Sequence, residues 1–457
     1  MSKNNIDKKI ILGEEFIPKQ WYNIQADLPK SLPGHYNTRE SRLATVDDFS
    51  MLFSKAAATQ EFSKERFIDI PQEVREIYKI WRTTPLVRAT GLEKALGVKS
   101  KIYFKNESVS PSGSHKSNSA VAQAFYNKSE GITRITSETG AGQWGSALSM
   151  ACKEFDLECM VYMVKISFMQ KPYRKSLMEV FGAKVVASPS ELTKTGREIL
   201  AKTPDTTGSL GDAIAEAIED TLTHKNSKYS LGSVLNHVLM HQTVIGLEAK
   251  KQMEAVDAYP DIVIGCLGGG SNFAGVAFPF LMDKLQKSTP LRAIAVEPSA
   301  CPKLTKGEYT YDFGDSTGLT PALKMHTLGH NFTPQGIHAG GLRYHGASPL
   351  VSLLVDEKVV EARAVAQKEV FEAALLFARS EGILPAPESA HAIKVAMEEA
   401  LKAERDGTPK TILFNLSGHG HFDLSAYDNY LKGNISDCDY SQEEVNRNLK
   451  SLPKINT

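Results

Sequence analysis

Short apolar runs alternate with helical patterns along most of this chain, and that alternation constrains its fold more than any other feature. Residues 100–107, SKIYFKNE, have the pattern of a strand, and residues 117–131, SNSAVAQAFYNKSEG, have that of a helix ending at a glycine. The same rhythm predicts strands at 132–140, 158–165 and 183–189 and helices at 144–155 and 171–182. Strands that alternate with helices in this way form a parallel sheet with helices on both faces.

A second series follows a long helix predicted at 244–255. It comprises strands predicted at 261–267, 291–297 and 410–418 and helices predicted at 274–287, 357–380 and 388–404. We therefore expect an α/β protein with two three-layer α/β domains and mainly parallel sheets. Residues 81–235 are predicted to form the N-terminal domain and residues 236–457 the C-terminal domain, with residues 1–80 as an irregular lead-in packed on the core.

The composition argues against several classes of protein. Lysines plus arginines equal aspartates plus glutamates at 53 each, so no bulk positive field favours a nucleic acid partner. The charged N-terminus lacks the apolar run of a signal peptide, and no segment approaches the roughly 18 apolar residues of a membrane span. The five cysteines form no CxxC pair and are odd in number, which favours reduced thiols and a cytoplasmic location.

A glycine-rich turn follows the strand predicted at 261–267. In GCLGGGSNFAG, residues 265–275, three glycines precede a helix start, so free backbone amides and the helix dipole favour an anion such as a phosphate. The alternatives are a turn needed only for packing and a dinucleotide site, in which Glu297 at the end of the next strand would bind a ribose. A Walker loop does not fit, because Asn272 and Phe273 stand where Lys and Ser/Thr belong.

A second glycine turn, SETGAGQWG at 137–145, follows another strand. Its amides suit a small carboxylate, and Glu138 stands beside them; a buried acid there would have a raised pKa, which suits acid–base catalysis near neutrality. The alternative is an exposed glutamate at a strand end. In NLSGHGHFD, residues 415–423, Ser417 closes a strand and is either functional or a turn former.

Two histidine pairs at helical spacing, His237/His241 and His326/His330, could be metal ligands. No third ligand is placed by the sequence, and an HEXXH motif is absent. We therefore expect no metal site built from these side chains.

Lys116 lies in SPSGSHKSNSA, residues 110–120, among small polar residues with no neighbouring carboxylate. Such an amine can lose its proton and form a Schiff base. An unpaired lysine, a phosphate-binding turn and a separate carboxylate-binding turn together predict pyridoxal phosphate (PLP) as the cofactor.

The motifs also carry a family resemblance. Their order is TTPLVRA (83–89), IYFKNESVSPSGSHKSNSA, ETGAGQWG, GCLGGGSN, GILPAPESAHA (382–392) and NLSGHGHFD. The chain resembles the fold-type II PLP enzymes over roughly residues 80–430, and among them the tryptophan synthase β chains, above all their longer second class. The ETGAGQ turn separates it from the threonine synthases and serine dehydratases.

The resemblance implies a role for each matched residue. Lys116 is the Schiff-base lysine, Glu138 the catalytic acid–base, and Ser417 lies at the pyridine nitrogen. The other cofactor-binding residues are His115, Gly268, Gly269, Gly270, Ser271, Asn272 and Glu388. The substrate carboxylate is bound by a mobile subdomain of the N-terminal domain through Thr139, Gly140, Ala141, Gly142 and Gln143.

The implied reaction is β-replacement, forming L-tryptophan from indole and L-serine through an aminoacrylate. A serine at the pyridine nitrogen agrees with this, because it makes the ring a weaker electron sink and favours β-elimination over racemisation. The alternatives are a serine or threonine dehydratase and, less favoured, a nicotinamide-dependent dehydrogenase. The resemblance also implies a homodimer, a monovalent cation (Na⁺ or K⁺) and, as a possible partner, a tryptophan synthase α subunit.

Three residues depart from the better-known class of β chain: Trp144 and His419 replace a histidine and an arginine, and Arg343 replaces an aspartate that recognises the substrate hydroxyl. These changes and the longer lead-in put a conventional α subunit in doubt. A guanidinium suits a phosphate better than a hydroxyl, so Arg343 raises the hypothesis that O-phospho-L-serine is a donor. The alternative is that Arg343 pairs with a structural acid.

Overall fold

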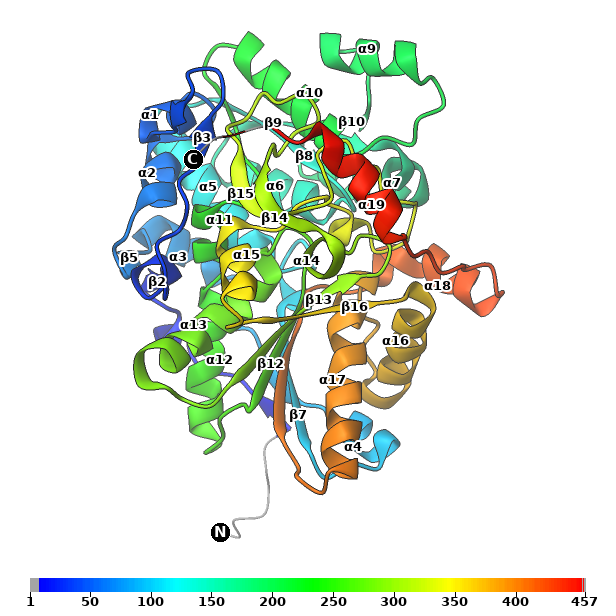
Figure 1. The fold of residues 1–457 in the computed structure, drawn as a ribbon. Coiled ribbons are helices and arrows are strands. Elements are labelled where there is room, and N and C mark those ends of the chain that lie inside the picture. The colour runs from blue at the N-terminus through cyan, green and yellow to red at the C-terminus, as the bar shows by residue number, and fades with distance from the viewer. Residues whose placement is uncertain (1–7, 454, 456–457) are drawn as a thin grey trace.

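Two separate sheets with parallel strands organise the chain (Figure 1). The computed structural model describes residues 8–453 and 455. The larger sheet has seven strands and the smaller has four. The prediction of an α/β protein with mainly parallel sheets is confirmed.

The larger sheet owes its burial to helices on both faces. Along each central strand one set of apolar side chains, such as Val263 and Leu413, packs on one side, and the alternate set, such as Ile264 and Phe414, packs on the other, as the two-residue period of a strand requires. In sheet order the strands are β1 (Lys9–Ile10), β6 (Leu86–Arg88), β7 (Lys101–Asn106), β17 (Thr411–Leu416), β12 (Ile262–Cys266), β13 (Arg292–Pro298) and β16 (Glu361–Val365).

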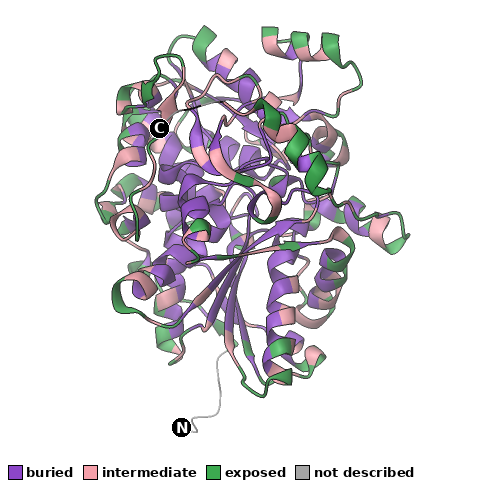
Figure 2. Cartoon of the chain, viewed as in Figure 1, coloured by how far each residue is buried: buried purple, intermediate pink, exposed green. Residues whose placement is uncertain are grey.

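The five strands from β7 to β16 are parallel, whereas β1 and β6 join antiparallel at one edge. Helices α12 (Val244–Ala255) and α13 (Ser271–Lys287) cover the face of Val263, and α16 (Gln367–Glu381) and α17 (Pro387–Arg405) cover the face of Ile264. Figure 2 shows the buried strands between these layers and the exposed residues on the outer helix faces.

The smaller sheet is parallel throughout. Its order is β10 (Lys184–Ser188), β9 (Glu158–Val164), β8 (Arg134–Thr139) and β11 (Ser227–Tyr229). Its helices include α5 (Ser117–Ser129), α6 (Gln143–Glu154), α8 (Pro172–Val180) and α10 (Leu210–Thr223). The chain enters the larger sheet before residue 110 and returns to it after residue 260. The division of the chain into two domains at residue 235 stays a prediction.

Some local predictions differ from the structure. The helix expected at 357–380 contains strand β16 in its first half, and the helix α16 begins only at Gln367. The strand is half exposed at the sheet edge, so its apolar pattern is weak. The helix expected from 274 already begins at Ser271, directly after the glycines.

Residues 8–80 of the N-terminal segment include the short α-helices α1 (Val46–Ser50), α2 (Lys55–Phe62) and α3 (Gln72–Tyr78). Its side chains Trp21, Tyr22 and Phe49 are buried against the rest of the chain. Within the described residues, no helix combines the length and the apolar character needed to cross a membrane.

A buried ionic network joins these layers. The Arg82 guanidinium donates to Glu248 at 2.6 and 2.8 Å and to Glu107 at 3.1 Å through each of two nitrogens, and the Lys105 ammonium donates to Glu248 at 2.8 Å. Burial raises the pKa of Glu107, but the charges of Arg82 and Lys105 outweigh it and lower that pKa to about 2. Arg82 also donates to the Asn118 side chain at 2.7 Å, which anchors the first turn of α5.

Replacing Arg82 by methionine should therefore leave two carboxylates buried with one ammonium. Breaking one partner out of a buried network costs about 3–5 kcal/mol, so Arg82→Met should lower the free energy of unfolding by that amount in a urea titration followed by circular dichroism. Lys432→Met removes an exposed pair with Asp428 and serves as the control, with no measurable change expected. Equal urea midpoints for the two variants would contradict the prediction.

Candidate active site

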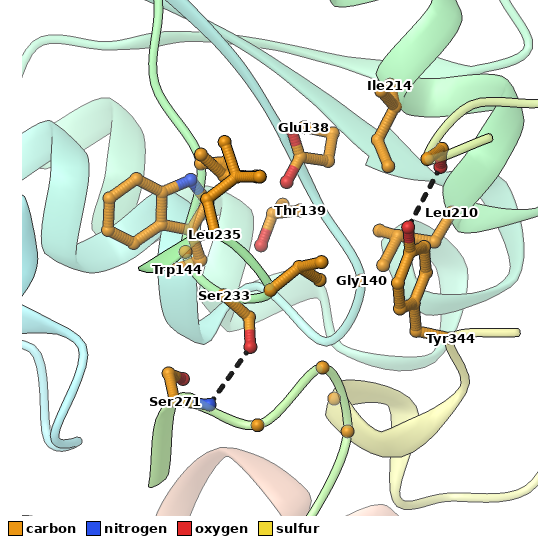
Figure 3. A pocket seen from close by; sticks show the side chains of 18 of the residues that line it. Glu138, Thr139, Gly140, Trp144, Leu210, Ile214, Ser233, Leu235, Ser271 and Tyr344 are labelled. Carbon is orange, nitrogen blue, oxygen red and sulfur yellow. Dashed lines mark hydrogen bonds between the residues drawn. The ribbon is translucent and has the colours of Figure 1, made fainter. Parts of the chain in front are cut away.

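A cavity lies where strands of both sheets end (Figure 3). Strands β8, β12 and β17 end at Thr139, Cys266 and Leu416, and the residues at or after these ends line the cavity. Ligands of open α/β sheets bind at the carboxyl ends of the strands. Of the predicted site residues, those that line the cavity are His115, Lys116, Glu138, Thr139, Gly140, Ala141, Gln143, Gly268, Gly269, Gly270, Ser271, Asn272, Glu388 and Ser417.

The glycine turn between β12 and α13 has no room for side chains. A Cβ at Gly268 would lie 2.3 Å from the Gly341 carbonyl oxygen, and one at Gly269 would lie 2.6 Å from Ser233 Oγ. Gly270 has φ +126°, a conformation that L-residues rarely adopt. In the described part of the chain, the amides of residues 268–270 have no protein acceptor, so they and the N-terminus of the 17-residue helix α13 fit a phosphoryl group.

Lys116 precedes α5 and points its amine at the wall of the cavity. Its Nζ donates to the Gly232 carbonyl and, at 3.0 Å, to Ser271 Oγ. Within residues 8–453, no carboxylate lies within 4 Å of this amine. Burial lowers the pKa of Lys116 to about 8, although the charges of Glu138 and Glu388 oppose the shift, so a neutral amine is accessible near neutral pH.

His115 lies between the glycine turn and the end of β17. Its Nε2 is 3.2 Å from Ser271 Oγ, and its Nδ1 is 3.3 Å from the Ser417 carbonyl. Burial and the neighbouring charge of Lys116 lower its pKa to about 3. The imidazole is therefore neutral at physiological pH and acts as a hydrogen-bonding group.

Glu138 is buried at the end of β8, with its carboxyl in the cavity (Figure 3). Burial raises its pKa to about 7, and a hydrogen bond from the Tyr229 hydroxyl partly opposes that shift. A carboxyl with this pKa can donate and accept protons near neutrality.

The turn after Glu138 presents free amides. Gly142 has φ +90°, and a Cβ there would lie 2.7 Å from Arg174 Cβ. Helix α6 begins at the next residue, Gln143. Over the described residues, the amides of residues 140–144 have no protein acceptor, which is the arrangement that binds a carboxylate.

Two further predicted residues complete this side of the site. Glu388 Oε1 accepts from the Gly341 amide at 2.9 Å, and its Oε2 accepts from the Gln143 side chain at 3.2 Å. Ser417 Oγ is 2.7 Å from Ser389 Oγ and 3.6 Å from Cys266 Sγ.

Arg343 lies beside the cavity wall, beneath Gly340, and outside the residues that line the cavity. Its guanidinium is buried and donates to Ser167 Oγ at 2.6 Å. Burial lowers its pKa to about 10, against the charge of Glu388. Among the residues described, no carboxylate forms an ion pair with it, so the alternative of a structural acid partner receives no support.

Of the other two departures noted in the sequence, Trp144 lines the cavity and His419 does not. The Trp144 indole lines the cavity and donates to Ser137 Oγ at 2.7 Å, and a Cβ at Gly232 would lie 2.6 Å from its ring. His419 packs on Gly113, where a Cβ would lie 2.0 Å from its Nε2.

Sequence reasoning missed a third glycine turn and an apolar wall. Gly232 follows strand β11 as the other glycines follow β8 and β12. This repeated pattern of a strand followed by a glycine is the sequence feature that indicates the third turn. The wall has no signal local in sequence, because its residues come from α1 and the residues after it, α10, the Gly232 turn, strand β15 (Leu323–Thr327) and the segment before α15 (Pro349–Asp356). They are Phe49, Leu52, Phe53, Leu210, Ile214, Leu235, Leu323 and Tyr344.

Other candidate residues have structural partners instead. The Glu297 carboxylate accepts from the Leu304 amide at 2.9 Å and from the Thr305 amide and hydroxyl, so it caps a helix and is not free for a ribose. His237 and His241 contact Glu61 and Gln60, and His330 contacts Asp312. The described residues contain no group of three or more such side chains positioned for a metal.

Comparisons with known proteins show the family of the chain. A family model described as pyridoxal-phosphate dependent enzyme matches residues 77–418. The chain is 58% identical over 427 residues to tryptophan synthase beta chain 2 of Methanosarcina acetivorans, covering 93% of this chain and 97% of that one. The chain belongs to the tryptophan synthase β-chain family of PLP-dependent enzymes.

Two further matches extend the relationship. The tryptophan synthase beta chain of Pyrococcus horikoshii is 53% identical over 453 residues, which cover 99% of this chain and 98% of that one. The crystal structure of a fungal L-serine ammonia-lyase from Rhizomucor miehei superposes with a TM-score of 0.57 and 19% identity, over 77% of this chain and 98% of that one. The second match shows a shared fold. Family membership confirms the resemblance and PLP as the cofactor, and the residue roles stay predictions.

The cofactor fit can be tested at Gly270. A Cβ in the Gly270→Ala variant, at φ +126° and 3.0 Å from Ser348 Oγ, would force the turn to move, so PLP affinity should fall at least about tenfold in an absorbance titration, equivalent to about 1.4 kcal/mol. Gly131→Ala is the control, because Gly131 has φ +76° and open space around it. A PLP affinity of Gly270→Ala equal to that of the control would contradict this assignment.

Proposed function

We propose that this β chain forms L-tryptophan from indole and L-serine by PLP-dependent β-replacement. One observation carries the proposal: a single cavity combines an isolated lysine, a phosphate-binding turn, a carboxylate-binding turn with a protonatable acid, and an apolar wall. The near-full-length relatives named tryptophan synthase beta chain support the same function.

The cofactor, when bound, supplies an electron sink that weakens the bonds at the α-carbon of an amino acid. The amides of residues 268–270 and the start of α13 would hold its phosphoryl group, with His115 and Ser271 beside them. The Lys116 amine, with its pKa near 8, suits both covalent attachment of an aldehyde and transfer of a proton at the α-carbon.

The amides of residues 140–144 would bind the α-carboxylate of the amino acid and so orient its side chain toward Glu138. A Glu138 carboxyl with a pKa near 7 can protonate the departing hydroxyl and then accept a hydrogen bond from the indole N–H. Positioned acid–base groups of this kind contribute about 10² to 10⁴ in rate.

The apolar wall suits indole as the second substrate. Leu210, Ile214, Leu235 and Tyr344 face the cavity around Glu138 (Figure 3). A planar apolar ring fits such a surface, and burying the surface keeps water from competing as the nucleophile. Ser417, with a neutral hydroxyl, favours elimination and replacement over racemisation.

Further features follow from family membership and belong to the same proposal. They are a homodimer, a monovalent cation and a cytoplasmic location, the last in keeping with five free cysteines. A complex with a tryptophan synthase α subunit is testable by gel filtration of the mixed chains.

The proposal is tested with indole, serine and the Lys116→Ala variant. The wild-type holoenzyme should form tryptophan, and the variant should lose both the visible absorption of the lysine-bound cofactor and at least about 10³ of the rate, because the lysine both holds the cofactor and moves the proton. A serine dehydratase would instead release pyruvate at a rate indifferent to indole. Full activity in Lys116→Ala would refute the assignment.

The donor is tested through Arg343. The Arg343 guanidinium is buried and has no carboxylate partner among the described residues, and such a group favours an anion. We therefore infer that O-phosphoserine is used beside or instead of serine. Replacing Arg343 by alanine should lower the ratio of kcat/KM for phosphoserine to that for serine at least about tenfold, and Arg343→Lys should lower it less because the charge remains. Equal kinetics with both donors, together with an unchanged ratio in Arg343→Ala, would end this hypothesis.

A further inference from the structure

We propose that Tyr229 is a positioning residue that holds the Glu138 carboxyl in the cavity, and that the N-terminal helix α1 and the residues after it hold Tyr229. The inference rests on the proposed role of Glu138 as the acid–base of the reaction. Neither Tyr229 nor α1 is recognisable as a site element from the sequence.

The contact between the two side chains is direct. Tyr229 ends β11 and Glu138 lies near the end of the adjacent strand β8, where Tyr229 is in register with Thr136. Both side chains are buried and both line the cavity. The Tyr229 hydroxyl donates to Glu138 Oε2, which ties the carboxyl on β8 to the neighbouring strand β11.

Tyr229 can act only as a protonated phenol here. Burial, followed by the charge of Glu138, raises its pKa well above the usual value. The hydroxyl therefore stays a donor at every working pH, and its hydrogen bond favours the ionised form of Glu138. Tyr229 thus limits how far burial raises the pKa of Glu138.

The N-terminal segment supports Tyr229 from behind. The Tyr229 amide donates to the Leu52 carbonyl at 2.8 Å, and its ring centre lies 5.5 Å from that of Phe53. Phe49, Leu52 and Phe53 also line the cavity. Helix α1 and the residues that follow it therefore form part of the catalytic cavity.

A neighbouring tyrosine offers a matched control. Tyr162 lies on β9 in register with Glu138, is equally buried, and donates to Asp220 Oδ2 at 2.8 Å. It does not line the cavity. The Tyr162→Phe variant therefore loses a buried phenol–carboxylate hydrogen bond of the same kind, one strand away from the site.

The experiment compares Tyr229→Phe, Tyr162→Phe and wild-type holoenzyme with indole and serine across pH. Loss of the Tyr229 hydrogen bond should raise the pKa of Glu138, so the limb of the kcat profile that titrates with Glu138 should move about one unit to higher pH. The KM for serine should stay within about twofold, because the carboxylate-binding amides are unchanged. Tyr162→Phe should keep the wild-type profile.

A second readout does not depend on the reaction. The carbonyl stretch of protonated Glu138, assigned by its loss in Glu138→Gln, reports the titration of Glu138 by infrared spectroscopy and should shift in the same direction in Tyr229→Phe. Failure of the wild type to make tryptophan would refute the proposed function and leave this shift to be measured. An active wild type whose pH profile and infrared titration are both unchanged in Tyr229→Phe would overturn the inference.

The Phe53→Leu variant tests the support from the N-terminal segment. It keeps an apolar filler but removes the ring that contacts Tyr229, so both readouts should shift in the same direction as in Tyr229→Phe and by less. If Glu138 titrates in Phe53→Leu as it does in the wild type, the N-terminal segment does not support Tyr229.

Discussion

Close approach of backbone at three glycine turns is the constraint on which the rest of the site depends. The turns follow β12, β8 and β11, and at each a Cβ would collide with a neighbour: Gly268 with the Gly341 carbonyl, Gly142 with Arg174, and Gly232 with Trp144. Strands β8 and β11 are parallel neighbours and end at the same edge of the smaller sheet, whereas β12 belongs to the larger sheet. The turns after β12 and β8 nevertheless line one cavity, and in the described part of the chain their amides have no protein acceptor. The proposed recognition of a phosphate and a carboxylate would therefore come mainly from backbone geometry.

Burial sets the protonation chemistry of the same cavity. It lowers the pKa of Lys116 to about 8 and raises that of Glu138 to about 7, so one cause brings an amine and a carboxyl to neighbouring pKa values from opposite sides. A buried ionic network supports the same region. Arg82 pairs with Glu107 and Glu248 and also donates to Asn118, which lies in the first turn of α5, two residues after Lys116. Rigid placement of that turn fixes where the Lys116 amine points.

The N-terminal segment contributes more to the cavity in the structure than its sequence predicts. Its proline-punctuated pattern predicts an irregular lead-in, yet Phe49 and Phe53 reach the cavity and Tyr229 hydrogen-bonds to Leu52. Arg343, which is predicted to bind the substrate, lies beside the cavity wall and is not among the residues that line the cavity. From its position next to Gly340, the Arg343 guanidinium would act on a substrate through its positive charge. The O-phosphoserine hypothesis therefore predicts that the substrate phosphate lies on the cavity side of Gly340.

The sequence by itself determined the repeating strands and helices, with α12 placed at its observed bounds, the two glycine turns that are predicted to bind phosphate and carboxylate, and the isolation of Lys116. These features are local: periodicity and glycine position act within about ten residues. Only the tertiary structure decided the edge strand β16, the apolar wall and the pairing of Tyr229 with Glu138. Those depend on which segments, often 90 or more residues apart, pack together, and no local pattern records that choice.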